Sequence, residues 1–312
     1  MLLPYCPDLT VRATVTLLAL LLAGAAGVLG QAPAFRAGVD MVAVSLTVTG
    51  PDGRYVPGLT AGDFHVFEDG APQEVLLFER ATNPLTVSLL LDSSNSMVEQ
   101  LELAQQAAIE FVSRLRPQDT VEVIDFDSRV RILQEFTSER PALDRAISSV
   151  IAGGSTSLHE AIFLALGRLE NVRGRDGIEA RREVVLVLSD GADNSPLVRF
   201  DPLIGMVRRS PSVIYPIGLG LNEPPGLAFS RWAADSEANL RRFAGETGGR
   251  LMLANEAADL SGVYAAIADE LSNQYLLGYA AKDPERLGWR RIRVESPRPD
   301  IEIRTRTGYY YQ

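Results

Sequence analysis

A run of oxygen-bearing residues, Asp92-Ser93-Ser94-Asn95-Ser96, follows an apolar stretch and precedes a helical pattern. Its D-x-S-x-S spacing offers one carboxylate and two hydroxyls from alternate residues of one loop. Such a loop can aim Asp92, Ser94 and Ser96 at one centre, and these oxygen ligands suit Mg²⁺, with Mn²⁺ or Ca²⁺ as alternatives. Taken alone, the run is more often a helix cap, because Ser96 and Glu99 have the spacing of a capping box.

Two later loops offer groups that fit the same centre. Gly153-Gly154-Ser155-Thr156 precedes a helical pattern, so the Thr156 hydroxyl can face the cation. Ser189-Asp190-Gly191 ends a second apolar run and adds the carboxylate of Asp190. Either loop alone is an ordinary turn, but all three occur in order at strand ends or helix starts, where ligands bind in open α/β sheets. Five groups, one or two acting through water, leave a metal position open for an outside ligand.

The segments that must position these loops alternate between strand and helix patterns. Short, almost wholly apolar runs are typical of strands buried on both faces of a parallel sheet. Helical patterns between them predict right-handed crossovers and a doubly wound, mostly parallel α/β sheet. We expect strands at 85–91, 121–126, 130–133, 184–188 and 213–217, and helices at 97–115, 141–150, 158–170, 201–209, 237–247 and 258–272.

The chain on either side of this region reads as β-structure. Alternating and β-branched runs lie within 41–80, and three more follow residue 273. Each flank alone offers only about three strands, which is marginal for independent stability. We therefore predict that the two flanks pair into one β-sandwich with the α/β domain inserted between them. The expected segments are 31–82 for the N-terminal β-segment, 83–273 for the α/β domain and 274–312 for the C-terminal β-segment.

The N-terminus has the order of a secretory signal. Arg12 precedes an apolar run to Leu29, and small residues gather before Gly30. This order predicts a signal peptide at 1–30 and an exported, periplasmic, envelope or secreted protein. The alternative is an uncleaved membrane anchor, since the run nearly reaches the ~20 residues that span a bilayer. Cleavage would remove Cys6, the only cysteine, so the mature chain would have no disulfide and no thiolate ligand.

Composition limits the classes of partner. The chain has 312 residues, of which 46% are hydrophobic and 22% charged, which is typical of a globular protein. Its net charge of -10 disfavours nucleic-acid binding, because an acidic surface repels phosphates. No small-molecule substrate is evident from the sequence.

The three loops together resemble the von Willebrand factor type A domain, whose metal-ion-dependent adhesion site combines D-x-S-x-S with a threonine and an aspartate from two later loops. The flanks, through segments 56–60, 63–70, 275–279 and 308–310, resemble exported bacterial proteins of the VWFA-related type, frequent in Acidobacteria. The resemblance implies that serines and threonine bind the metal directly and that aspartates often act through water. The implied ligands are Asp92, Ser94, Ser96, Thr156 and Asp190.

The resemblance also implies a function, metal-dependent adhesion, in which a glutamate or aspartate of a protein partner completes the coordination shell. Surrounding loops would select the partner, and segments 194–200 and 220–236 are the least regular parts of the α/β region. We expect His159 on the first turn of its helix, beside the metal loop, as a surface histidine. Packing of Phe229 and Trp232 onto the domain is at least as well supported as a binding role. The candidate rim residues are Asn95, Ser155, His159, Phe229 and Trp232.

Recognisable catalytic motifs are absent. His159-Glu160 has no second histidine four residues on, and the chain has neither a G-x-S-x-G elbow nor a P-loop. We therefore expect a binding protein and not an enzyme. Two alternatives stay open: a structural envelope module whose metal site is stabilising or non-functional, and a hydrolase with dispersed catalytic residues, since spatial triads leave no sequence spacing.

Overall fold

The computed structural model describes residues 41–176, 181–190, 197–220, 229–282 and 286–311. The predicted signal segment, 1–30, lies outside them. Within the described residues, no helix combines the length and the apolar composition needed to cross a bilayer.

A six-stranded sheet forms the centre of the α/β domain, in the order β10-β9-β8-β5-β6-β7. All neighbours are parallel except β6 and β7, which form the expected hairpin. All eight residues of β5 are buried, as expected for a strand covered on both faces. The strands are β5 (Leu85–Asp92), β6 (Thr120–Phe126), β7 (Val130–Thr137), β8 (Arg182–Ser189), β9 (Val213–Leu219) and β10 (Met252–Ala254).

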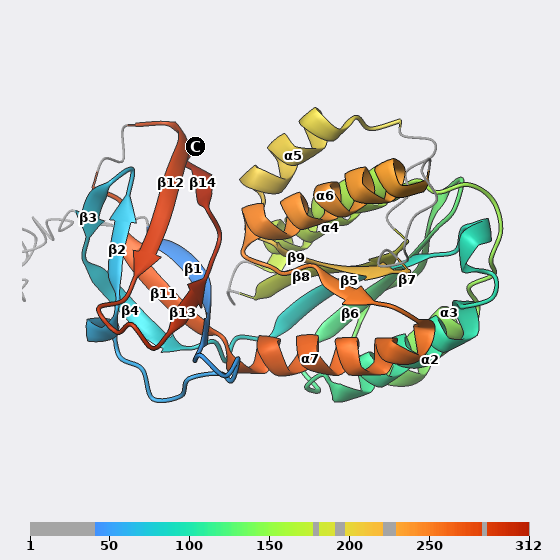
Figure 1. The fold of residues 1–312 in the computed structure, drawn as a ribbon, viewed down its shortest axis with the longest axis horizontal. Coiled ribbons are helices and arrows are strands. Elements are labelled where there is room, and N and C mark those ends of the chain that lie inside the picture. The colour runs from blue at the N-terminus through green and yellow to red at the C-terminus, as the bar shows by residue number, and fades with distance from the viewer. Residues whose placement is uncertain (1–40, 177–180, 191–196, 221–228, 283–285, 312) are drawn as a thin grey trace, which may run out of the picture. The chain divides into compact units, whose positions relative to one another are not determined.

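Helices cover both faces of this sheet (Figure 1). Side chains of β5 alternate between two cores: Val87, Leu89 and Leu91 pack with α2, α3 and α7, whereas Leu90 packs with α4, α5 and α6. The doubly wound fold is therefore confirmed. The helices are α2 (Leu101–Arg114), α3 (Arg140–Ser148), α4 (Leu158–Asp176), α5 (Phe200–Arg209), α6 (Phe229–Thr247) and α7 (Leu260–Asn273), with short 3₁₀ turns at Ala61–Asp63, Asn95–Met97 and Ala257–Asp259.

The prediction of irregular structure through residue 236 is wrong, because α6 begins at Phe229. Residues 229–244 contain neither glycine nor proline and are rich in alanine, arginine and other good helix formers. Pro224-Pro225-Gly226, a run typical of irregular structure, comes just before the helix in the sequence and gives the whole segment an irregular pattern.

The two flanks pair into two four-stranded sheets, ordered β13-β1-β11-β4 and β14-β12-β2-β3. Each sheet mixes strands from both ends of the chain, and one apolar core joins them through residues such as Val44, Val66, Leu277 and Ile292. The predicted β-sandwich is therefore confirmed. Its strands are β1 (Met41–Thr49), β2 (His65–Glu68), β3 (Ala71–Gln73), β4 (Val75–Arg80), β11 (Tyr275–Ala280), β12 (Gly288–Glu295), β13 (Glu302–Arg304) and β14 (Gly308–Tyr311).

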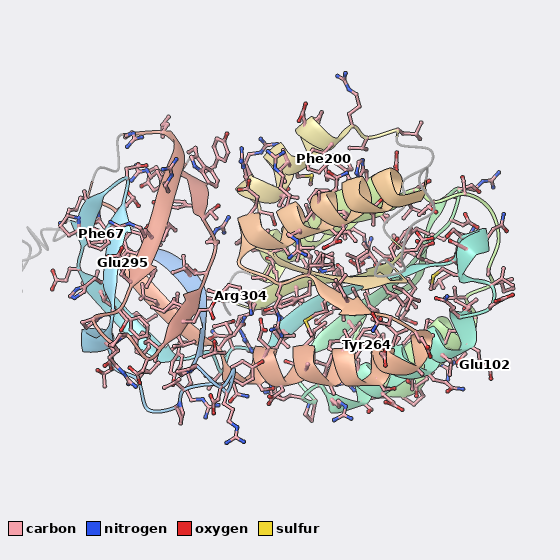
Figure 2. All side chains as sticks on the ribbon, viewed as in Figure 1. Phe67, Glu102, Phe200, Tyr264, Glu295 and Arg304 are labelled. Carbon is pink, nitrogen blue, oxygen red and sulfur yellow. The ribbon has the colours of Figure 1, made fainter. Side chains whose placement is uncertain are left out.

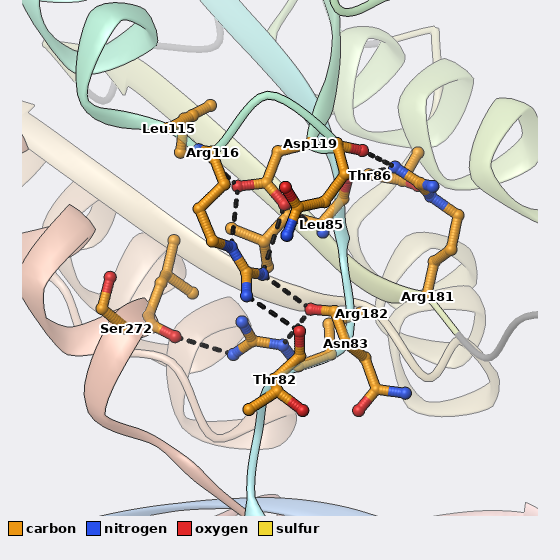
Figure 3. Close-up of polar contacts among 12 residues, drawn as sticks. Thr82, Asn83, Leu85, Thr86, Leu115, Arg116, Asp119, Arg181, Arg182 and Ser272 are labelled. Atoms are coloured by element: carbon orange, nitrogen blue, oxygen red, sulfur yellow. Dashed lines mark hydrogen bonds and ion pairs between the residues drawn. The ribbon is translucent and has the colours of Figure 1, made fainter.

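Arginines fix the chain where it passes from β4 into β5 (Figure 3). Arg116 donates to the carbonyl oxygens of Thr82 and Asn83, both at 2.8 Å. The Asp119 carboxylate accepts the Leu85 N–H at 2.7 Å. These bonds satisfy the backbone groups of the segment between the two sheets, which have no strand partner there. They therefore fix the position at which β5 starts.

The Glu270 carboxylate, buried at the end of α7, holds the sandwich to the α/β domain. It accepts a hydrogen bond from Tyr215 Oη of β9 at 2.7 Å and another from Arg304 Nη2 of β13 at 2.6 Å. Arg304 is labelled in Figure 2. Thr47 Oγ1 of β1 lies at 3.4 Å from the same oxygen. The last helix of the domain is thus tied by charge-assisted bonds to the strands of the sandwich.

Candidate metal centre

The Asp92 carboxylate lies buried at the carboxyl end of β5, with 1% of the residue exposed. The Ser94 N–H donates to Oδ1 at 2.9 Å and Ser189 Oγ donates to Oδ2 at 2.6 Å. Burial raises the pKa of Asp92 to about 7, and the negative charge of Asp190 raises it further. The hydrogen bonds from Ser189 and Ser94 act in the opposite direction and lower this pKa. Among the described residues, no cationic side chain pairs with Asp92 to compensate its charge when it is ionised.

The two serines of the first loop hold their hydroxyls together, although Ser94 is buried and Ser96 exposed. Ser94 Oγ and Ser96 Oγ lie 2.9 Å apart, within hydrogen-bond distance. The capping-box alternative is not realised, because α2 begins at Leu101 with Gln100 as its cap. Ser96 lies instead in the 3₁₀ turn Asn95–Met97. Both hydroxyls therefore stay with the Asp92 loop.

Two backbone hydrogen bonds join the second loop to the first. The Asn95 N–H donates to the Gly154 carbonyl at 3.1 Å, and the Gly153 N–H donates to the Ser93 carbonyl at 2.7 Å. Thr156 follows two residues later and is 1% exposed. In the described parts of the chain, its hydroxyl has no hydrogen-bond partner. Thr156 is carried by a loop that hydrogen-bonds to the Asp92 loop.

A second layer of residues supports the first loop and was missed from the sequence. Ser93 Oγ donates to the Asp125 carboxylate at the end of β6. Arg131 Nη2 pairs with Asp125 at 2.6 Å and with Asp127 at 2.8 Å. The sequence signal available was that Asp125 lies near the end of the strand pattern 121–126, as Asp92 does at the end of its own strand. Because Arg131 neutralises both carboxylates, they do not form an acid–base pair.

These residues fit a hard divalent cation. Asp92 brings a buried carboxylate that no cationic side chain among the described residues pairs with, and Thr156 brings a buried hydroxyl. Among the described residues, no three His, Cys, Asp or Glu side chains are placed so that they could hold a metal ion together, so hydroxyls must supply much of the donor set. Such oxygen donors favour Mg²⁺, Mn²⁺ or Ca²⁺ over softer metals. Asp190 directly follows Ser189, whose hydroxyl contacts Asp92.

The candidate rim residues differ in their exposure to solvent. Asn95 is exposed and Ser155 half-buried, whereas the expectation of a surface His159 is wrong, because that residue is 6% exposed. His159 does lie on the first turn of α4, but its Nδ1 is 3.0 Å from the Val198 carbonyl and its ring packs against Phe200 and Phe243. The side chains of Phe229 and Trp232 lie outside the described residues.

Exposed apolar side chains around the loops were missed. Val98 is 59% exposed just after the first loop, and Ile151 is 78% exposed just before the second. The two loops that carry them are those joined by the Asn95 and Gly153 bonds. Apolar residues at loop positions were the signal, since a loop offers them no core to fill.

Gly154 should be required for the loop geometry, because its φ is +83° and an added Cβ would lie 3.0 Å from Ser128 Oγ. We expect Gly154→Ala to lower the free energy of unfolding by about 1–2 kcal/mol, the cost of a left-handed alanine, and to weaken cation binding. Gly153→Ala is the matched control, since its Cβ would meet nothing within 4 Å. Urea unfolding of both variants tests this, and equal losses would contradict it.

Comparisons with known proteins agree with this geometry. Residues 87–192 match the family model of the von Willebrand factor type A domain. The solved structure of a von Willebrand factor type A protein from Catenulispora acidiphila superimposes with a TM-score of 0.52 at 13% identity, covering 83% of this chain and 65% of that one. That likeness shows the fold.

Two curated relatives match over shorter stretches. Protein sll0103 of Synechocystis sp. is 37% identical over 111 residues, which is 35% of this chain and 25% of that protein. A UPF0353 protein of Mycolicibacterium paratuberculosis is 27% identical over 228 residues, 68% of this chain and 67% of that protein. The chain thus spans a quarter of the first relative and two thirds of the second.

Proposed function

We propose that this chain, whose residues 87–192 form a von Willebrand factor type A domain, binds a protein partner through a divalent cation at the carboxyl edge of its sheet. The observation that carries the proposal is the buried Asp92 carboxylate, which has hydroxyl and N–H donors but no cationic partner among the described residues. Keeping such a charge buried is costly without a counter-ion.

Five residues would hold the cation. Ser94, Ser96 and Thr156 would bind through their hydroxyls, and Asp92 and Asp190 through water or directly. Ser189 positions Asp92, and Ser93 with Asp125 and Arg131 holds the first loop in place. The cation, Mg²⁺ by donor chemistry, would supply one open position for a carboxylate.

The partner would present an aspartate or glutamate beside apolar side chains. Val98 and Ile151 offer exposed apolar surface on the two loops nearest the cation. Because the charge-assisted contact fixes orientation and the apolar contacts add selectivity, such a pair suits specific binding. Arg131 neutralises Asp125 and Asp127, which supports binding and not acid–base catalysis. We further propose cleavage after residue 30 and export of the remaining β, α/β and β segments.

The experiment passes the envelope fraction of the source organism over the immobilised chain and identifies the proteins that it retains. We expect a protein that is retained in Mg²⁺, lost in chelator and lost with Asp92→Asn, which removes the charge and keeps the shape. An alanine in place of an acidic residue of the captured protein should also abolish retention. Identical retention with and without chelator would contradict the proposal and favour a structural module.

A further inference from the structure

A hollow of about 340 Å³ opens between the sandwich and the α/β sheet. Its walls include Thr86, Val184 and Val213, which lie at the amino ends of β5, β8 and β9, and Ala43 and Leu276 from the sandwich. The candidate metal residues Asp92 and Asp190 lie at the carboxyl ends of two of these strands, β5 and β8. At about 3.3 Å per residue over eight-residue strands, the hollow is roughly 20–25 Å from the candidate metal centre.

This hollow is mainly apolar. Its size lies within the range of small-molecule sites, which are mostly apolar with a few polar groups that fix orientation. Water in such a space finds few hydrogen-bond partners, so an apolar ligand can displace it. The apolar walls come from both domains: Leu169, Val172, Val184, Pro211, Val213 and Leu276.

A second hollow of about 380 Å³ adjoins the first, since Ala43 and Pro211 line both. Arg209, Arg306 and the tyrosines of β14 form part of its wall. Ala43 is exposed on the outer side of β1 and so faces this space without belonging to the sandwich core.

The charge around the two hollows is the reverse of the chain's net charge of -10. Their walls hold one carboxylate, Glu183, which already pairs with Arg173 and Ser212. Against it stand five arginines: Arg173, Arg181, Arg182, Arg209 and Arg306.

Four of these arginines, Arg181, Arg182, Arg209 and Arg306, have no acidic partner among the described residues. Arg181 and Arg182 donate instead to backbone carbonyls and neutral side chains. Arg306 donates to the carbonyl oxygens of Gly308 at 2.6 Å and Ser210 at 3.1 Å, and burial lowers its pKa to about 10. Arg209 is exposed and lies over the ring of Tyr310 at 6.0 Å. A guanidinium without a counter-ion favours an anion nearby.

We propose that the joined hollows bind an amphipathic carboxylate, with its alkyl chain in the apolar hollow and its carboxylate at Arg209 beside Arg306. The two parts of the wall match the two parts of such a ligand: apolar side chains from both domains, and guanidinium groups that suit a carboxylate. The site is independent of the metal centre, which occupies the other edge of the sheet.

The test is titration calorimetry of the full chain with decanoate, decanol and butyrate. We expect one decanoate per chain, with an affinity about tenfold or more above those of decanol and butyrate. Decanol lacks the carboxylate, and butyrate lacks the long alkyl chain. Asp92→Asn should leave decanoate binding unchanged. Equal affinities for decanoate and decanol would overturn the assignment of the carboxylate to Arg209.

Variants locate the binding. Ala43→Trp should fill the space where the hollows meet and abolish decanoate binding, whereas Ala71→Trp, on an exposed position of β3, should bind normally. Arg209→Gln should reduce decanoate affinity to that of decanol and leave decanol binding unchanged. Unfolding midpoints check that each variant is folded. Full decanoate binding by folded Ala43→Trp, or cosedimentation with anionic vesicles in place of decanoate binding, would overturn the proposal.

Discussion

Replacing Arg290 with methionine is expected to lower the free energy of unfolding by about 3–5 kcal/mol, the cost of leaving one partner of a buried ion pair alone. Arg290 is 1% exposed and Glu68 6% exposed in the sandwich. Arg290 Nη1 lies 2.7 Å from Glu68 Oε1, and Tyr279 Oη and Tyr309 Oη each donate to Oε2 at 2.8 Å. Burial, with Glu68 beside it, raises the pKa of Tyr279 and keeps this hydroxyl a donor.

The loss should come from the uncompensated charge of Glu68. The double variant with Glu68→Gln and Arg290→Met should therefore recover part of it, since no charge stays buried. Arg298→Met is the matched control, because Arg298 pairs with Asp300 at 2.7 Å on the exposed surface and its loss should change stability little. Denaturant unfolding measures all three. An Arg290→Met variant as stable as Arg298→Met would show that the pair does not stabilise the sandwich.

Removing divalent cations is expected to destabilise the wild-type chain and leave Asp92→Asn unaffected. A cation at 100 times its dissociation constant stabilises the folded state by about 2.7 kcal/mol. In chelator, Asp92→Asn should be at least as stable as the wild type, because it removes a buried charge and keeps an acceptor for the Ser94 N–H. Thermal unfolding in chelator and after Mg²⁺ return measures both. A melting temperature of Asp92→Asn that rises with Mg²⁺ as the wild type's does would contradict the site.

The sequence predicted the elements whose burial follows from their own residues. β5 and β8 are apolar runs buried on both faces, and the pairing of the flanks followed from their being too short to stand alone. β10 was missed because it has only three residues. The start of α6 was missed because Pro224 and Pro225 come just before its helix-forming residues in the sequence.

Side-chain partners were the part that sequence patterns could not supply. Glu68 and Arg290 are 222 residues apart, and nothing local marks either as buried. His159 is buried by Phe243 of α6, 84 positions along the chain, so its own helix pattern gave no sign. Asp92, Ser94 and Ser96 were predictable because one loop carries them. Asp190 was named as a ligand from the sequence, but the contact of its neighbour Ser189 with Asp92 was not predicted.

The metal centre is tested most directly by titration calorimetry of Mg²⁺ into the metal-free chain. The arrangement of Asp92, Ser94 and Ser96 with the second loop predicts one ion per chain in the wild type and no binding to Asp92→Asn. Gly154→Ala should bind more weakly than Gly153→Ala. No Mg²⁺ binding by the wild type, or binding that Asp92→Asn retains, would contradict the account.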